Sequence, residues 1–243
     1  MRIINLFILL FLYYNLYGQS GNSYSSRWHY VKDEKNPGDH DEYSFNKKSK
    51  LYYFLTNDLT KIYISLKVED KGVMGRILHE GLIVWISMDN KTEKNMGIRF
   101  PVGSENVDNQ LIHNLPAKSL ADEKDLTQAA DNANTIELIG FRNEPSKRFP
   151  AENNDSFAGT MKIDEDGVLH YQLILPVEKI PVRNSRSGTG ALPFTIGIEY
   201  GNIASSIEKG GKDINKKPEL NTSESSRKSV VMWIRNIKLA EER

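Results

Sequence analysis

Residues 81–101, GLIVWISMDNKTEKNMGIRFP, decide the fold. They open with the continuous apolar run LIVWI at 82–86, which contains β-branched and aromatic residues. A strand that is apolar on both faces is normally covered on both faces, so this run predicts a central core strand. The polar residues at 89–95 predict a turn, and residues 97–101 predict a second short strand.

Alternating apolar residues predict further strands on both sides of this stretch. The clearest is a hairpin at 51–68, in which Ile62, Ile64, Leu66 and Val68 alternate after an Asn-Asp turn. Other strands are predicted at 27–31, 135–142, 157–163, 169–175, 194–200 and 230–239. In the last of them, one face is predicted to carry Val231, Trp233, Arg235, Ile237 and Leu239.

Two short helices interrupt the strands. Asp70 is placed to cap a helix at 71–79, and Gly81 can end it. A second helix is predicted at 120–130, after the capping-box pattern that begins at Ser119. Some eight to ten strands with few helices predict an all-β protein, an antiparallel, jelly-roll-like β-sandwich. We expect one domain at 27–243, after a flexible lead-in at 19–26.

Composition excludes several classes of function. Lysine plus arginine equals aspartate plus glutamate at 32 each, so the chain has no net field to attract nucleic acid or an anionic membrane. It contains no cysteine, which excludes disulfides, thiolate metal sites, a cysteine nucleophile and attachment of lipid to a cysteine.

The first eighteen residues predict a signal peptide. Arg2 is followed by the apolar run LFILLFLYY at 6–14 and by a cleavage region that ends at Gly18. A membrane anchor is the alternative, but the run is shorter than the roughly 18 to 20 apolar residues that span a bilayer. We therefore expect a secreted or periplasmic protein that is not an integral membrane protein after cleavage.

The order of these features resembles a known group of domains. The hairpin with its Asn-Asp turn, the short helix, GLIVWISMD, GIRFP and the final VVMWIRNIKLA are similar to secreted bacterial domains of the family 9 carbohydrate-binding modules and the wider DOMON-type sandwiches. The resemblance covers residues 51–101 and, more loosely, 157–239. It implies a ligand-binding sandwich in which aromatic rings clamp a sugar and calcium can support the structure. The chain shows no catalytic domain, so we expect a stand-alone module.

Five residues are candidates for contact with a ligand. Sugar binding needs flat aromatic faces together with amides, carboxylates or guanidinium groups. The candidates are Trp85, Arg99, Glu199, Tyr200 and Trp233. The alternative for both tryptophans is core packing. For Arg99 it is an ion pair with Asp89 or Glu199.

No residue set indicates catalysis or a metal. The five histidines, His29, His40, His79, His113 and His170, lack metal-ligand spacing, and core filling explains the methionines better than haem ligation does. Oxygen ligands for a structural calcium ion are present at Asp164-Glu165-Asp166-Gly167, and at Asp89 with Glu93, but both sites are more simply turns. We expect no cofactor and no catalytic residue.

The leading functional hypothesis is non-catalytic binding of a carbohydrate in polysaccharide utilisation. The alternatives are an envelope or cell-surface scaffold with no sugar ligand and, less favoured, a hydrolase or haem-binding domain. A fold alone does not choose among them, so the decision rests on the site.

Overall fold

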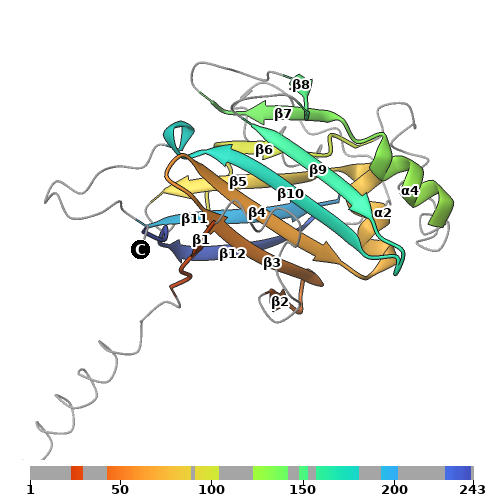
Figure 1. Cartoon of the computed structure of the whole chain (residues 1–243), viewed down its shortest axis with the longest axis horizontal. Coiled ribbons are helices and arrows are strands. Elements are labelled where there is room, and N and C mark those ends of the chain that lie inside the picture. Colours follow the sequence, from red (N-terminus) through yellow and green to blue (C-terminus); the bar gives the residue numbers. More distant parts are fainter. Residues whose placement is uncertain are drawn as a thin grey trace, which may run out of the picture.

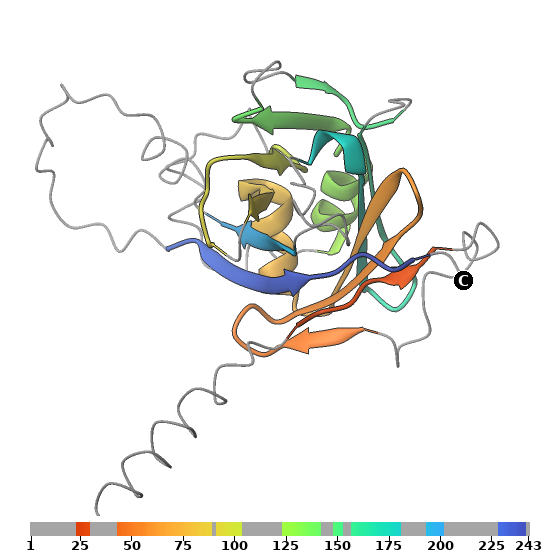
Figure 2. The same cartoon turned by 90° about the vertical axis from the view of Figure 1, so that its left-hand side faces the viewer.

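Two β-sheets face each other around one apolar core. The computed structural model describes residues 23–29, 43–88, 91–103, 123–141, 148–152, 157–180, 193–201 and 228–241. Within these residues, the sheets form two layers and two helices lie together at one end of them (Figures 1 and 2). The predicted all-β sandwich is confirmed.

The first sheet has the order β1-β3-β4-β10-β9, with β2 paired to β3. Its strands are β1 Arg27–Trp28, β2 Ser44–Asn46, β3 Leu51–Asn57, β4 Lys61–Val68, β9 Ala158–Ile163 and β10 Leu169–Pro176. The predicted hairpin is β3 and β4. Asp58 Oδ1 fixes its turn by accepting from the backbone N–H groups of Thr60 at 2.6 Å and Lys61 at 2.7 Å. The alternating row predicted in β4 is buried in the core.

The second sheet has the order β12-β11-β5-β6-β7-β8. Its strands are β5 Leu82–Met88, β6 Gly97–Arg99, β7 Thr135–Ile139, β8 Arg148–Pro150, β11 Phe194–Tyr200 and β12 Val230–Ile237. β5 lies between β11 and β6, and its residues 82–87 are all buried. The prediction of a central core strand is confirmed.

The two helices fill one end of the sandwich. Helix α2, Lys71–Glu80, begins where the Asp70 side chain accepts from the Val73 N–H at 3.0 Å. It ends at Gly81, whose φ of 95° favours glycine. The predicted helix at 71–79 is therefore confirmed. Helix α4, Glu123–Asp131, confirms the second predicted helix from residue 123 onward. A short 3₁₀ helix, η4 Val177–Lys179, follows β10.

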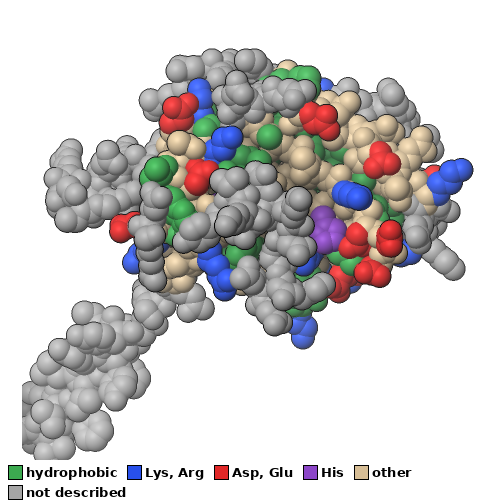
Figure 3. Space-filling view, viewed as in Figure 1, with side chains coloured by type: hydrophobic (Ala, Val, Ile, Leu, Met, Phe, Trp, Pro, Cys, Tyr) green, Lys and Arg blue, Asp and Glu red, His purple; other side chains and the backbone are tan. Residues whose placement is uncertain are grey.

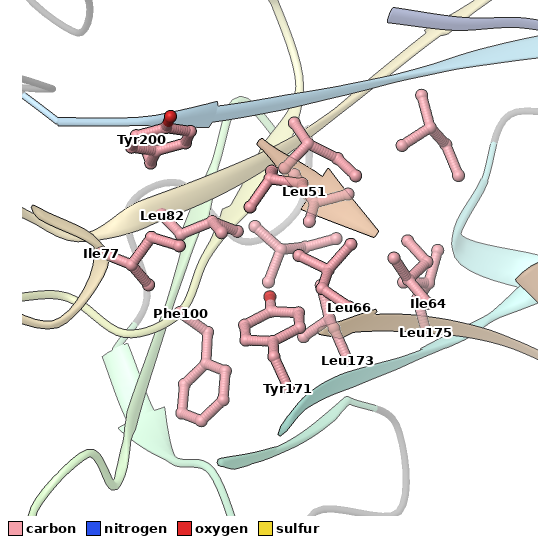
Figure 4. Packing of buried hydrophobic residues seen from close by; sticks show 14 of the residues in the cluster. Leu51, Ile64, Leu66, Ile77, Leu82, Phe100, Tyr171, Leu173, Leu175 and Tyr200 are labelled. Carbon is pink, nitrogen blue, oxygen red and sulfur yellow. The ribbon is translucent and has the colours of Figure 1, made fainter. Parts of the chain in front are cut away.

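The core lies between the sheets and is closed by α2. Figure 4 shows side chains from both sheets and from α2 meeting there, among them Leu51, Leu66, Tyr171, Leu173, Ile77, Leu82 and Tyr200. The ring of Phe100 packs against the backbone of Gly159, where a Cβ atom would lie 2.6 Å from the ring. This contact holds the end of β6 against β9.

One edge of the sandwich is not antiparallel, contrary to the prediction. β1 pairs in parallel with β3, and Ser25 forms a parallel bridge with Lys238 beyond β12. Asn57, at the end of β3, links the N-terminal segment to the segment after β12. Its Oδ1 accepts from Ser26 Oγ at 2.5 Å and from the Ala240 N–H at 2.8 Å. The N-terminal segment therefore connects the edges of both sheets.

The prediction of which β12 side chains share one face is also wrong in part. Met232 and Ile234 face the core, whereas Trp233 packs on the outer side and Arg235 is exposed. A register shift against β11, with Asn236 at a φ of 53°, then returns Ile237 to the core. An extra residue in one strand of a pair has this effect.

Several predictions lie outside the described residues. They concern the signal peptide at 1–18, most of the lead-in at 19–26, and Asp89. None of the helices that the structure describes is long and apolar enough to cross a membrane.

Candidate functional site

Four of the five predicted site residues share the outer face of the second sheet. Strand register places them in two adjacent rows that run across the strands. The tryptophan row consists of Trp233, Gly197, Trp85, Gly97 and Ile139. The charged row consists of Val231, Glu199, Ile83, Arg99, Glu137 and Arg148.

In the tryptophan row each indole covers a neighbouring glycine. A Cβ atom on Gly197 would lie 2.5 Å from the Trp233 ring, and one on Gly97 would lie 2.7 Å from the Trp85 ring. Without side chains at these two positions, both rings can lie close against the sheet. Trp85 is only 1% exposed, whereas Trp233 is partly exposed. Trp233 is therefore the ring of this row that a ligand can reach.

Glu199 is a buried carboxylate, 0% exposed, with three donors around it. Its Oε2 accepts from Trp85 Nε1 at 2.7 Å, and its Oε1 accepts from Lys94 Nζ at 2.7 Å and from Ser229 Oγ at 2.5 Å. Burial alone would raise the pKa of Glu199, but the hydrogen bonds from Lys94, Ser229 and Trp85 outweigh burial, so the pKa is lowered. Glu199 is therefore ionised at neutral pH, and it fixes the Trp85 indole.

Arg99 forms an ion pair, although with a partner that the sequence did not indicate. Its Nη1 lies 3.3 Å from Glu137 Oε2, and Arg148 Nε lies 3.0 Å from Glu137 Oε1. Arg99 thus pairs with Glu137 on the neighbouring strand, while the cation beside Glu199 is Lys94. Two guanidinium groups share one carboxylate, which aligns the row across β6, β7 and β8.

Tyr200 is separate from this face. It lies in the core row of β11, 2% exposed, and its hydroxyl donates to the Ser49 carbonyl at 2.9 Å. Burial raises its pKa, and Arg76 lies over its ring with 5.3 Å between guanidinium carbon and ring centroid. Tyr200 therefore joins helix α2 to the two sheets.

The sequence reasoning missed Lys94, Glu137, Arg148 and Ser229. Lys94 and Ser229 lie in loops beside the strands. Glu137 and Arg148 lie in β7 and β8, and both strands are distant in sequence from Glu199. A usable signal existed for Glu137 alone. It is the one charged residue inside the apolar stretch TIELIG, and the alternation places it opposite the core row.

Among the described residues, no group of three His, Asp or Glu side chains is arranged to hold a metal ion. At the predicted calcium turn, Asp164 Oδ1 accepts from the N–H groups of Asp166 at 3.0 Å and Val168 at 2.9 Å. Its Oδ2 lies 2.6 Å from His170 Nε2. The Asp164 carboxylate is thus already used within the hairpin.

Comparison with solved structures finds a family 9 carbohydrate-binding module from Caldicellulosiruptor kristjanssonii, solved in complex with glucose. It is 10% identical, has a TM-score of 0.34, and the match covers 91% of this chain and 97% of that chain. No protein-family model and no curated protein matches the sequence. Chains at that TM-score share little beyond general architecture, so the function rests on the geometry of this chain.

Proposed function

We propose that the protein is a non-catalytic module that binds a neutral, hydroxyl-rich glycan on the outer face of the second sheet. The observation that carries the proposal is the tryptophan row beside the charged row. A pyranose ring has an apolar face that packs on an aromatic ring, and its hydroxyl groups need polar partners at the edge of that ring. The two rows supply both kinds of group on one rigid sheet.

In this proposal Trp233 is the contact surface, and Trp85 is its support. Trp233 lies over Gly197, and Gly197 pairs with Trp85 on the next strand. Trp85 is held by its hydrogen bond to Glu199. Trp233 packs against the buried pair Ile83 and Trp85, so its ring loses little conformational freedom when a sugar stacks on it, which favours affinity.

The pairing of charges supports a neutral ligand. Lys94 neutralises Glu199, and Glu137 lies between the guanidinium groups of Arg99 and Arg148. Lys94 and Arg148 keep side chains that are 33% and 46% exposed, so their N–H groups can still donate to sugar hydroxyls. Both carboxylates therefore have a cation beside them, and the three cations exceed the two carboxylates by a single charge, so a highly charged ligand gains little from this group.

The same pairing argues against glycoside hydrolysis on this face. A general acid in such a reaction needs a raised pKa, so that it holds a proton at neutral pH. The pKa of Glu199, the buried carboxylate of this face, is lowered rather than raised. We therefore place binding, rather than turnover, at this site.

A glycan array with the exported form of the chain tests the proposal. We expect binding to a neutral oligosaccharide, and we expect Trp233→Ala to weaken it about tenfold or more, since stacking on an aromatic ring is lost. The control is Arg235→Ala, two residues further along β12 and exposed, which should bind normally. If no neutral glycan binds, or if both variants bind equally well, the proposal fails.

We also propose that residues 1–18 direct export and are then removed. The measurement is N-terminal sequencing of the protein recovered from the periplasm or the medium. Mature protein that still begins at Met1 would contradict this part of the proposal.

A further inference from the structure

The outer face of the second sheet presents hydrogen-bond donors to solvent and keeps its carboxylates underneath. The side chains of Lys94 and Arg148 are 33% and 46% exposed, whereas those of Glu199 and Glu137 are 0% and 14% exposed. Lysine and arginine side chains carry only donors, and ionised carboxylates carry only acceptors. The outer face of the first sheet differs, because side chains of both signs reach the surface there (Figure 3). A ligand on the second sheet therefore meets N–H groups first.

The carboxylates on this side of the protein already serve as acceptors. Glu199 accepts from three donors, and each oxygen of Glu137 has a guanidinium group beside it. Strand β12 contains no Asp or Glu. Glu93 is exposed in the loop between β5 and β6, but Lys91 Nζ lies 3.5 Å from its Oε1 and Asn95 Nδ2 donates to its Oε2 at 3.1 Å. A sugar hydroxyl bound on this face would therefore find few acceptors for its own proton.

Lys94 is the donor placed beside the tryptophan row. The loop that carries it lies on the outer face, since the Glu93 N–H donates to Ser87 Oγ of β5 at 3.3 Å. From there Lys94 Nζ reaches Glu199 Oε1 on β11 at 2.7 Å. Glu199 is a diagonal cross-strand neighbour of Trp233, and residues related in this way lie about 7 to 8 Å apart. The ammonium group is thus at the edge of the ring on which we expect the sugar to stack.

The Lys94 ammonium group keeps donors for a ligand. It has three N–H groups, and among the residues that the structure describes its partner is Glu199 alone. A hydroxyl group that accepts from Lys94 still needs an acceptor for its own proton, whereas a carbonyl oxygen only accepts. A carbonyl oxygen therefore suits this face better than a hydroxyl group does.

An uncharged glycan carries a carbonyl oxygen in its acetyl groups, which are bound to nitrogen or to oxygen. The methyl part of an acetyl group needs an apolar neighbour beside the donor. Val231 provides one, because it pairs directly with Glu199 in the charged row and is partly exposed. The donor and the apolar contact thus lie together, next to Trp233.

We propose that this site selects neutral glycans that carry acetyl groups, whether N-acetyl or O-acetyl. The inference rests on the proposed function and names the class of glycan. The sugar ring stacks on Trp233, the acetyl carbonyl oxygen accepts from Lys94 Nζ, and the methyl group contacts Val231. A carboxylate could also accept from Lys94, but the cations of this face exceed its carboxylates by a single charge, so a polyanion gains little.

The test measures binding of the full exported chain to two matched pairs of ligands by isothermal titration calorimetry. One pair is N-acetylated chitopentaose and cellopentaose, which share a backbone and differ in the acetamido group. The other pair is acetylated xylan and the same xylan after alkali has removed its esters. These pairs separate N-acetyl from O-acetyl recognition. We expect the acetylated member of at least one pair to bind about fivefold more tightly, because it gains a hydrogen bond to a charged donor.

Four variants locate the preference. Lys94→Met should bind both members of the pair equally, whereas Lys94→Arg keeps the donors and should keep the preference. The matched control is Lys91→Met, an exposed lysine of the same loop, which should also keep it. Val231→Thr keeps Lys94 and replaces a methyl group with a hydroxyl group, so it should lower the preference. Thermal melting checks folding, and Val231→Thr still tests the proposal if Lys94→Met does not fold.

Several results would overturn the proposal. Equal binding of both members of both pairs by the wild type would end this inference alone and leave the proposed function standing. A preference that persists in Lys94→Met, or that disappears equally in Lys91→Met, would end it as well. So would tighter binding of polygalacturonate than of any acetylated ligand, since the donors would then select charge. If no neutral glycan binds, the proposed function and this inference both fail.

Discussion

Removal of the Lys94 ammonium group probes the electrostatics of the site directly. Lys94→Met leaves the buried Glu199 carboxylate with two neutral donors, Trp85 Nε1 and Ser229 Oγ. Breaking a buried ion pair costs about 3 to 5 kcal/mol. The Lys94 side chain is 33% exposed, and water screens part of the interaction. We therefore expect the free energy of unfolding to fall by about 1 to 3 kcal/mol.

The same substitution in a Glu199→Gln background isolates the pair. The amide carries no charge, so Lys94→Met should then cost less than about 0.5 kcal/mol. The measurement is urea denaturation at pH 7, followed by tryptophan fluorescence, for the wild type, both single variants and the double variant. Equal costs of Lys94→Met in the two backgrounds would refute the reasoning, since they would show no coupling between the groups.

The pH dependence of stability gives a second readout of Glu199. Its folded-state pKa lies below the ordinary value near 4.5, so the unfolded chain binds more protons between the two values. The stabilisation is therefore complete above about pH 4.5, and it is lost as pH falls through the folded-state pKa. Glu199→Gln should show a smaller loss in this window. An identical acid profile for the wild type and the variant would contradict the lowered pKa.

Three other substitutions test the packing. Gly97→Ala should destabilise by about 1 to 3 kcal/mol in thermal or urea unfolding, because its Cβ would lie 2.7 Å from the buried Trp85 ring; unchanged stability would show that the ring can move. Tyr200→Phe should cost about 1 kcal/mol, since the hydrogen bond to the Ser49 carbonyl is lost, without changing glycan binding; weaker binding would place Tyr200 in the site after all. Asn57→Ala should speed amide hydrogen exchange at Ser26 and Ala240, whose side chain and N–H bond to Asn57, and at Lys238, whose carbonyl accepts from the Ser26 N–H; unchanged exchange would mean that the edge is held by other contacts.

Local alternation predicted much of the fold correctly. The inward row of β4, the central position of β5 and the cap at Asp70 followed from residue types alone. The same alternation indicates that Tyr200 faces the core, although Tyr200 was predicted to contact a ligand. It alternates with Phe194, Ile196 and Ile198, so it belongs to the core row rather than to the outer face.

Pairing between distant strands could not be predicted in this way. Arg99 meets Glu137 only because β6 pairs with β7, and Glu199 meets Trp85 only because β11 pairs with β5. Neither partner is close in sequence, and alternation says which face a residue occupies without saying what lies beside it. The prediction of the inward face of β12 was wrong for a local reason, the extra residue at Asn236. Asparagine can occupy this position because it tolerates positive φ better than most residues.

The central claim is that a neutral glycan stacks on Trp233. The chain has three tryptophans, so a ¹H–¹⁵N spectrum contains one indole N–H signal each for Trp28, Trp85 and Trp233. Titration with the neutral oligosaccharide that binds best on the array should shift the Trp233 signal strongly and leave the Trp28 signal in place. Saturated binding with an unmoved Trp233 signal would contradict the account.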